Sequence, residues 1–305
     1  MKIASLLPSA TEIVCALGLV DSLVGVTHEC DYPSEVTGKP VLTASRIHGT
    51  ALTSAEIDHA VSTRLGGHQS LYTLDDERLR AFQPDLVLTQ ELCAVCAVSY
   101  AEVQKAARLL DGGTRVVSLE PTRLEEVFGT IELVGKMTGR TAQAAELVAS
   151  LHARVAAVRA RITDQTPRPR VWVCEWLDPP YAAGHWVPDQ VEAAGAREIF
   201  HRSGIPSARM APDQVVVAAP EVIVLAPCGF HLDEIEREMG RVTTFSGWDE
   251  IPAVRVKEVW AVDASSFFSR PGPRLVAGVE LLAQILRPDL FGPPHSNAAR
   301  RALDG

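Results

Sequence analysis

Two cysteines separated by two residues, Cys93 and Cys96, carry the most reactive chemistry in this sequence. They lie between an apolar run at 85–89 and a helical pattern at 99–110, and a helix start lowers the pKa of a thiol. Two thiolates do not complete a tetrahedral metal site. His28 and Cys30, which follow another apolar run, could supply further ligands. We therefore interpret Cys93 and Cys96 either as ligand or metal contacts or as small residues that pack a helix start.

Aromatic side chains gather in the second half of the chain, in segments predicted to be loops. Trp176 ends an apolar run. Residues 175–181, the last of which is Tyr181, are predicted to form a loop at a cleft edge. Trp186 with His185, and Phe267, follow in similar positions, whereas Trp172 is predicted to be core. Flat aromatic faces suit a planar macrocycle or a cation. We expect these aromatics and His185 to contact a ligand.

Polar residues at strand ends complete the candidate site. Ser9 and Glu12 have the spacing of a capping box at a helix start, and Ser9 could also contact a ligand. Gln90 and Glu91 follow the apolar run at 85–89. The sequence has no P-loop, no Gly-x-Ser-x-Gly, no Gly-x-Gly-x-x-Gly after a strand and no His-Glu-x-x-His. We predict a protein that is not an enzyme.

Short runs rich in Val, Ile and Leu alternate with helical patterns, which is typical of parallel sheets with crossover helices. The predicted strands are 3–7, 22–26, 70–73, 85–89, 115–119, 171–176, 222–226 and 258–262. The predicted helices are 10–17, 54–64, 75–82, 99–110, 188–194, 212–218, 232–239 and 273–286. The predicted fold is α/β, with two Rossmann-like lobes.

A long helical segment divides the chain. One helix is predicted from about Thr122 to Thr138, and 142–162 has no Gly or Pro and apolar residues at three-to-four spacing. The predicted domains are an N-terminal lobe at 1–121, a linking helical segment at 122–166 and a C-terminal lobe at 167–305. The cleft between the lobes is the expected ligand site. Residues 82–88 and 218–224 echo each other as helix end, Pro, acid and apolar strand, which is weak evidence for duplication.

Composition excludes several classes of protein. A net charge of −9 argues against a nucleic-acid partner. No run of about 18 apolar residues predicts a membrane span. The start, Met1 to Leu7, is too short an apolar run before Pro8 for a secretion signal. We expect a cytoplasmic location for the chain as written, and a periplasmic or cell-surface one if the start is misassigned. The six cysteines are predicted to be reduced.

Several segments resemble the vitamin B12-binding and iron-siderophore-binding proteins of ABC importers. They are 5–13, 23–27, 31–33, 179–181, 195–200, 220–224 and 270–274, so the resemblance covers about 1–288. It implies two lobes joined by a long linking helix and a corrinoid, such as cobalamin, or a related metal chelate held between the lobes. It also implies that Glu102 and Asp213 dock on the arginines of an ABC permease. His185 resembles a residue that could bind the cobalt of such a ligand at its lower axial position.

The sequence departs from the B12-binding pattern at some positions. Gln90 and Ser207 replace aromatics that stack on the corrin, and 91–99 with its cysteine pair resembles a cytosolic subgroup of these proteins. A second hypothesis therefore stays open beside the solute-binding one. In it, the chain is a cytosolic metal-binding or thiol-dependent metal-handling protein that uses Cys93 and Cys96.

Overall fold

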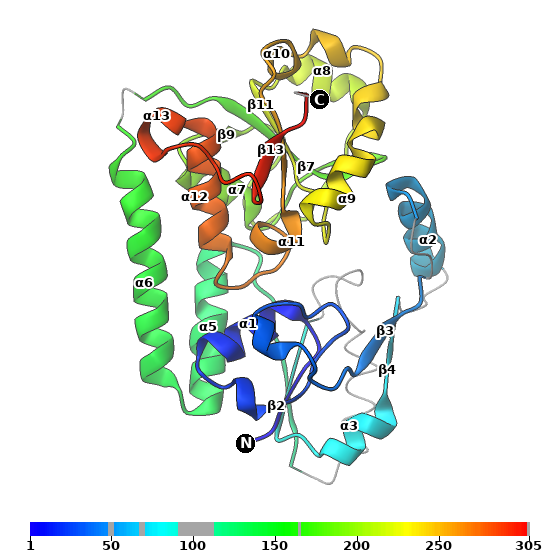
Figure 1. Cartoon of the computed structure of the whole chain (residues 1–305), viewed down its shortest axis with the longest axis vertical. Helices are drawn as coiled ribbons and strands as arrows, with labels where there is room; N and C mark the ends of the chain where they lie inside the picture. Colours follow the sequence, from blue (N-terminus) through cyan, green and yellow to red (C-terminus); the bar gives the residue numbers. More distant parts are fainter. Residues whose placement is uncertain (48–51, 67–70, 91–112, 164–165, 304–305) are drawn as a thin grey trace. The chain divides into compact units, whose positions relative to one another are not determined.

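The computed structural model describes residues 1–47, 52–66, 71–90, 113–163 and 166–303, and it divides into two compact units (Figure 1). The first unit consists of residues 1–52, 56–121 and 128–148, and the second of 53–55, 122–127 and 149–305. Both units are α/β, and each contains a mainly or wholly parallel central sheet. This confirms the predicted fold class.

The first unit is built on a four-stranded parallel sheet with the order β2-β1-β5-β6. Its strands are β1 (Ile3–Ser5), β2 (Leu23–Gly25), β5 (Leu86–Thr89) and β6 (Arg115–Ser118). Every residue of β5 is buried, as expected for a parallel strand covered on both faces. Outside the linking segment, the described residues of this unit form the helices α1 (Pro8–Ala16), α2 (Ser54–Gly66) and α3 (Asp76–Phe82).

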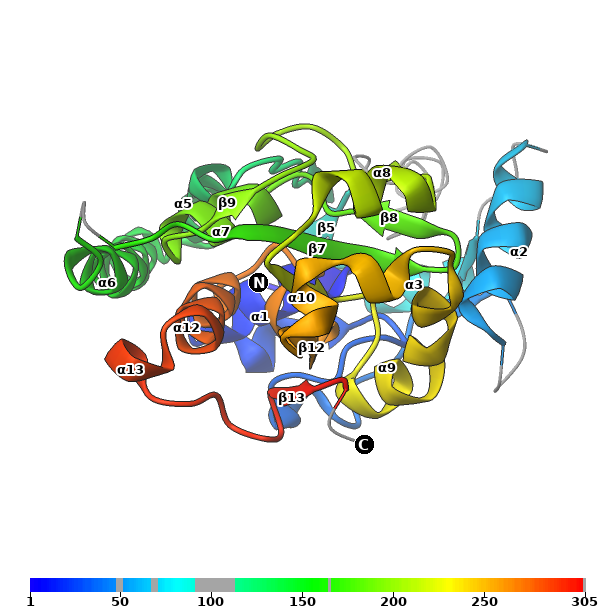
Figure 2. The ribbon, with the colours of Figure 1, turned by 90° about the horizontal axis from the view of Figure 1, so that it is seen from above.

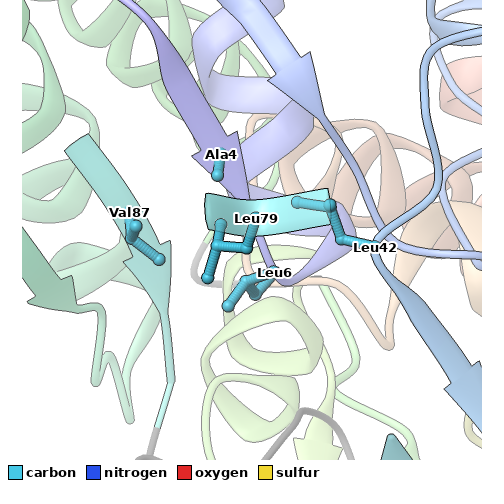
Figure 3. Close-up of a cluster of buried hydrophobic side chains, with 5 residues drawn as sticks. All are labelled: Ala4, Leu6, Leu42, Leu79 and Val87. Atoms are coloured by element: carbon cyan, nitrogen blue, oxygen red, sulfur yellow. The ribbon is translucent and has the colours of Figure 1, made fainter. Parts of the chain in front are cut away.

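A cluster of apolar side chains forms part of the core of this unit (Figure 3). Leu79 from α3 lies against Ala4 and Leu6 from the β1 region, Leu42, and Val87 from β5. At about 25 cal/mol per Å² of apolar surface, burying each leucine favours folding by roughly 2 kcal/mol. The cluster therefore fixes α3 against the sheet.

A separate two-stranded antiparallel sheet pairs β3 (Thr43–Ser45) with β4 (Tyr72–Leu74). The strand predicted at 70–73 was assigned to the parallel set, which is wrong, and β3 was not predicted. Both strands have only three residues, too few to show a clear alternation of apolar and polar positions.

The second unit contains a seven-stranded mixed sheet (Figure 2). Its order is β10-β8-β7-β11-β12-β13, and β9 also pairs with β7. The strands are β7 (Arg170–Leu177), β8 (Pro180–Ala182), β9 (Arg197–Glu198), β10 (Ala208–Arg209), β11 (Val222–Leu225), β12 (Val259–Val262) and β13 (Ala299–Arg301). Strands β9, β7, β11 and β12 are parallel, and the short strands β8, β10 and β13 are antiparallel additions that the sequence did not predict.

The helices of the second unit follow its strands. They are α7 (Val187–Ala193), α8 (Pro212–Ala218), α9 (Leu232–Glu238), α10 (Pro252–Arg255), α11 (Ala264–Phe267), α12 (Leu275–Leu286) and α13 (Pro288–Phe291). The start of α12 lies two residues after the predicted one. In the part of the chain that the structure describes, no helix combines the length and apolarity needed to cross a bilayer.

The C-terminal strand β13 pairs with the outer edge of β12, with Arg301 opposite Trp260. The Arg301 guanidinium carbon lies 4.9 Å from the centre of the Trp260 ring, and an Arg301 nitrogen lies 2.7 Å from a Glu258 carboxylate oxygen. A cation–π contact and an ion pair therefore hold the tail on the sheet.

Two helices contribute residues to both units. They are α5 (Leu124–Thr138) and α6 (Thr141–Ala160), close to the helices predicted at 122–138 and 142–162. In the second unit, Leu151, Val155 and Val158 of α6 are buried, and Arg154 forms a two-point ion pair with Glu280 of α12 at 2.8 and 2.6 Å. The predicted domain boundaries at 121/122 and 166/167 stay a prediction.

The parallel strands of the two units follow one plan. The order β2-β1-β5-β6 in the first unit corresponds to β9-β7-β11-β12 in the second. Ile3 pairs with Leu86, and Val171 pairs with Val222, so each central pair begins at the same point of the sequence echo. The echo between 82–88 and 218–224 therefore has a counterpart in three dimensions.

A hydrogen-bonded arrangement that occurs in both units lies at the amino ends of the central strand pair. In the first unit this pair is β1 and β5. The Asp85 carboxylate accepts from the Lys2 backbone N–H at 2.7 Å. The Lys2 ammonium donates to the carbonyl of Phe82, the last residue of α3, at 3.0 Å. Between them, Gln83 ends α3 with a left-handed φ of 45°. One acid and one cation thus fix a strand start and a helix end together.

The second unit repeats this device with different residues. Glu221 accepts from the Arg170 N–H at 2.8 Å, and the Arg170 guanidinium donates to the carbonyl of Ala218, the last residue of α8, at 3.1 Å. Ala219 ends α8 with a φ of 49°. We call these two arrangements the Asp85 clamp and the Glu221 clamp.

Removing either clamp carboxylate should destabilise its unit. We expect Asp85→Ala and Glu221→Ala each to lower the free energy of unfolding by about 1 kcal/mol, because each leaves a strand N–H without its charged acceptor. Urea unfolding should show the two losses adding in the double variant, since the sites lie in different units. Glu132→Ala, on the exposed side of α5, is the control and should change stability by less than about 0.5 kcal/mol. Equal losses in all three variants would contradict the clamp.

Candidate functional site

In each unit, the strand order places a ligand-binding position at a defined point. From β1 the chain crosses to β2 on one side, and from β5 it crosses to β6 on the other; β7 and β11 do the same in the second unit. In open α/β sheets, ligands bind outside the carboxyl ends of the two strands where the crossovers diverge. The candidate positions are therefore the carboxyl ends of β1 and β5, and those of β7 and β11.

A relay of hydroxyls and one thiol lies at the carboxyl end of β1. The Thr11 hydroxyl donates to Ser5 Oγ at 2.8 Å, and Ser5 donates to the Leu7 carbonyl at 3.0 Å. Since the Thr11 proton is used in this way, Thr11 Oγ1 accepts from the Cys30 thiol, 3.1 Å away, and Thr27 Oγ1 lies 3.2 Å from the same sulfur. The relay fixes the loop after β2 against the corner between β1 and α1.

His28, predicted as a ligand contact, lies beside the β3–β4 hairpin. Its Nδ1 is 2.8 Å from Thr43 Oγ1, and its ring centre is 5.5 Å from that of Tyr72. The Tyr72 hydroxyl donates to the Glu29 carboxylate at 3.3 Å. The structure thus brings His28 and Cys30 to the same loop and gives each of them protein partners.

Ser9 does not form the predicted capping box with Glu12. Helix α1 begins at Pro8, its N-cap is Leu7, and no side chain caps it. Proline is favoured at the first helical position because it has no N–H to satisfy. Ser9 and Glu12 therefore lie inside the helix and are buried.

At the end of β5, Gln90 is only 5% exposed, and the hydroxyl of the preceding Thr89 is buried without a hydrogen-bond partner. Glu91, Cys93, Cys96 and Glu102, and the helix predicted at 99–110, lie outside the described residues. Within the described ranges, no group of three or more His, Cys, Asp or Glu residues could hold a metal ion.

At the carboxyl end of β7, the segment predicted as a loop at 175–181 is instead a tight hairpin. Strand β7 continues to Leu177, and Trp176 lies opposite Tyr181 of β8. The Trp176 ring also meets Phe230, which follows β11, edge to face with ring centres 5.4 Å apart. Two predicted ligand contacts, Trp176 and Tyr181, are thus neighbours, and Trp176 lies at the point where the crossovers diverge.

Trp186 and Gln190, one turn apart at the start of α7, hold the end of α11, whose last residue is Phe267. The Trp186 indole N–H donates to the Phe268 carbonyl at 2.7 Å. The Gln190 amide donates to the carbonyls of Phe267 and Leu275 at 2.9 and 2.8 Å. Trp186 is only 7% exposed. Its indole positions the end of α11.

Gly278 of α12 makes this arrangement possible. A Cβ at this position would lie 2.3 Å from the Phe267 carbonyl oxygen and 2.5 Å from the Gln190 amide nitrogen. Only glycine allows the backbone to approach so closely.

His185 lies in a strained turn before α7. Its φ is 52°, its N–H donates to the Ile205 carbonyl at 2.7 Å, and its ring stacks on that of Trp186 at 5.6 Å. Burial lowers the pKa of His185, so the imidazole is neutral near pH 7. His185 and Trp186, both predicted to contact a ligand, thus stack on each other.

Three carboxylates hold the loop 199–207. Glu198 accepts from the N–H groups of Phe200 and His201, Asp189 accepts from Ser203, and Glu175 accepts from Ser207. Burial raises the pKa of Glu175, and burial also raises the pKa of Glu198 to about 7. The Asp189 pKa is lowered even though burial opposes this, because Arg123, Ser203 and the Leu124 N–H all bond to its carboxylate.

Two polar residues that follow β11 and β12, His231 and Asp263, were not predicted from the sequence as site residues. Their signal was present, because Asp263 directly follows the strand predicted at 258–262, and His231 follows the one predicted at 222–226 by five residues. Asp213, predicted to dock on a permease, is exposed in the first turn of α8.

Comparison with known proteins adds the family. A family model described as periplasmic binding protein matches residues 3–265. The chain belongs to the periplasmic binding protein family. Its relatives include an uncharacterised ABC transporter substrate-binding lipoprotein, YvrC of Bacillus subtilis, 27% identical over 297 residues, which are 95% of this chain and 81% of the relative. The vitamin B12-binding protein of Vibrio cholerae is 24% identical over 94% of this chain and 89% of the relative.

A solved structure shows the same fold. The periplasmic heme-binding protein RhuT from Roseiflexus sp. RS-1 superposes with a TM-score of 0.70 at 22% identity, over 93% of this chain and 97% of RhuT. As a member of the periplasmic binding protein family, the chain is a solute-binding protein and not an enzyme.

The Gly278 contact yields a matched pair of substitutions. We expect Gly278→Ala to lower the free energy of unfolding by more than about 2 kcal/mol, because the new methyl group must displace backbone. Gly129→Ala, in the interior of α5 with open space around it, should leave stability unchanged or raise it by up to about 1 kcal/mol. Thermal or urea unfolding of both variants measures the difference, and similar values would contradict the close packing.

Glu198 should make stability depend on pH. A carboxyl whose pKa is higher in the folded state stabilises the fold at low pH, and this contribution is lost as pH rises through about 7. We expect the free energy of unfolding to fall by about 1 kcal/mol between pH 6.5 and 8.5. Burial lowers the pKa of the neighbouring His201 from its ordinary value of 6.5, so its contribution has the opposite sign and reaches the lower edge of that window. The comparison with Glu198→Gln separates the two, because both chains keep His201. Glu198→Gln should remove most of the fall, and an unchanged slope would contradict this assignment.

Proposed function

We propose that this protein is the substrate-binding component of an ABC-type importer and that its ligand is a corrinoid such as cobalamin or a related metal chelate. The observation that carries the proposal is the match to the periplasmic binding protein family over residues 3–265, with relatives named as an ABC transporter substrate-binding lipoprotein and a vitamin B12-binding protein. A partner permease and a small-molecule ligand follow from this assignment.

The carboxyl edge of the second unit supports a large, flat ligand. Trp176 and Phe230 meet at the point where the crossovers diverge, and Tyr181 lies opposite Trp176 in the hairpin. Aromatic faces bind planar macrocycles through large apolar contact area. In the first unit, the hydroxyl and thiol relay around Cys30 offers polar groups suited to the amide side chains of a corrin.

Location and docking follow from the same assignment. The names of the relatives, a lipoprotein and a periplasmic protein, favour a site of action outside the cytoplasmic membrane over a cytoplasmic one. Asp213, exposed at the start of α8, would pair with an arginine of the permease, and Glu102 would do so from the first unit. The position of the ligand between the lobes stays a prediction.

A calorimetric titration of the purified full-length chain with cyanocobalamin tests the proposal. We expect one molecule bound per chain, and Trp176→Leu should weaken binding by about fivefold, because an aromatic contact contributes about 1 kcal/mol. Trp260→Leu, at the β13 edge of the same sheet, is the matched control and should leave affinity unchanged. Hemin and ferrichrome are the comparison ligands, and tighter binding of either would replace the corrinoid assignment. No binding of any of the three would contradict the proposed function.

A further inference from the structure

One carboxylate fastens the start of the segment 199–207, which has no regular secondary structure and joins β9 to β10. Glu198, the last residue of β9, accepts at Oε2 from the backbone N–H of Phe200 at 2.7 Å and from that of His201. Its second oxygen, Oε1, is buried and has no hydrogen-bond partner among the described residues. The Nε2 atom of the His201 ring is buried in the same way. Two titratable side chains therefore lie at one turn of the chain, each with a buried polar atom that lacks a partner.

This geometry favours a protonated Glu198. A carboxylate oxygen can only accept hydrogen bonds, and burying a charged oxygen without a donor costs far more free energy than burying a neutral one. Because Oε2 already accepts two N–H groups, the proton resides on Oε1. Burial accordingly raises the pKa of Glu198 from its ordinary value of 4.5 to about 7, although hydrogen bonds from the N–H groups of His201, Phe200 and Ile199 oppose the rise.

In the described part of the second unit, no basic side chain on the neighbouring elements forms an ion pair with Glu198. Strand β7 and helix α7 pack against β9. The charged side chains of these three elements are exposed or have other partners, and they are Arg170, Glu175, Asp189, Glu192 and Arg197. Glu198 therefore titrates as an enclosed carboxyl group with His201 as its titratable neighbour.

The far end of the segment holds the turn at His185. The His185 N–H donates to the Ile205 carbonyl at 2.7 Å, and the Gly204 N–H donates to the His185 carbonyl at 2.9 Å. His185 has a left-handed φ of 52°, a conformation that costs energy in a residue with a side chain and therefore needs such support. Loosening of the segment 199–207 thus reaches this turn directly.

We propose that residues 199–207 form a pH-responsive latch on the His185 turn, closed while Glu198 is protonated and loosened when Glu198 is ionised. Ionisation leaves a buried negative oxygen without a donor, and opening of the segment exposes that oxygen to water. His201 acts in the opposite sense, because protonation of its enclosed ring favours opening at low pH. The latch is therefore tighter in weakly acidic than in alkaline solution. This inference does not depend on which solute the chain binds.

Glu198 makes opening more favourable at high pH. A carboxyl group whose pKa is higher in the closed state binds its proton more tightly there, so its stabilisation of the closed state is complete below its ordinary pKa of 4.5. That stabilisation is lost as pH rises through about 7. With these two values, the equilibrium constant for opening rises about tenfold between pH 6 and pH 9.

Hydrogen exchange of the full-length chain tests the latch, measured by mass spectrometry with rapid mixing from pH 6 to pH 9. After correction for the intrinsic exchange rate, the opening constant of peptides covering 199–207 should rise about tenfold more in the wild-type chain than in Glu198→Gln. The glutamine keeps the shape of the side chain and cannot ionise. Both chains keep His201, so the comparison isolates the carboxyl group.

Two controls separate a latch from a general loss of stability. Glu192→Gln removes an exposed carboxylate from α7 and should keep the full rise. Peptides covering β11 report on the core of the same sheet, and 199–207 should open at least about tenfold more readily than they do at every pH, because its opening is local.

The remaining outcomes overturn the latch. They are an equal rise in the wild-type chain and Glu198→Gln, no rise in either chain, and equal opening constants for 199–207 and β11, which would mean that only global unfolding releases the carboxyl group. If Glu198→Gln fails to fold, the side-chain ¹³C shift of Glu198 in the wild-type chain decides instead. A titration midpoint within about one pH unit of the ordinary value overturns the latch as well.

Discussion

The pairing of two parallel strands whose crossovers diverge is the constraint on which each unit depends. Parallel strands cannot be joined by a tight turn, so every strand in the set must return through a crossover, and all carboxyl ends meet at one edge. In the first unit this pair is β1 and β5, and in the second it is β7 and β11. The Asp85 and Glu221 clamps secure the opposite, amino ends of the same pairs. One end of each pair is thereby fixed by charge, and the other is the candidate ligand-binding end.

The two units build different chemistry on the same plan. Around β1, the edge consists of hydroxyls and a thiol that satisfy one another in a relay through Thr11 and Cys30. Around β7 and β11, it consists of aromatic rings and a carboxylate-oriented imidazole, His231. A hydrogen-bonded network like that of the first unit is rigid when fully satisfied, whereas the aromatic rings of the second unit supply contact area.

Much of the fold could be predicted from the sequence, because its signals are local. The residues Leu86, Val87 and Leu88 form a continuous apolar run, and α6 has no helix-breaking residue. The hairpin β7–β8 could not be predicted, because Pro179 and Pro180 suggest a loop and the strand partner is set by register. The prediction that Ser9 forms a capping box was wrong, because the helix already begins at Pro8.

The site was predictable as a region and less so as a set of contacts. Trp176 and Tyr181 lie opposite each other near the carboxyl end of β7, whereas His185 and Trp186 follow β8 and stack on each other. The role of Trp186 depends on the Phe268 carbonyl, 82 residues away in the sequence. The His231–Asp263 contact spans 32 residues and joins two loops. Contacts of this kind become visible only when neighbouring strands are known.

The tail strand β13 marks the main difference between the two parallel cores. It covers the outer side of β12, whereas the corresponding strand of the first unit, β6, ends its sheet in the described part of the chain. Bare strand edges invite pairing with another chain, and β12 is buried along all four residues. Strand β13 therefore occupies an edge of β12 that would otherwise be open to pairing with another chain, and the stack of Arg301 on Trp260 holds it there.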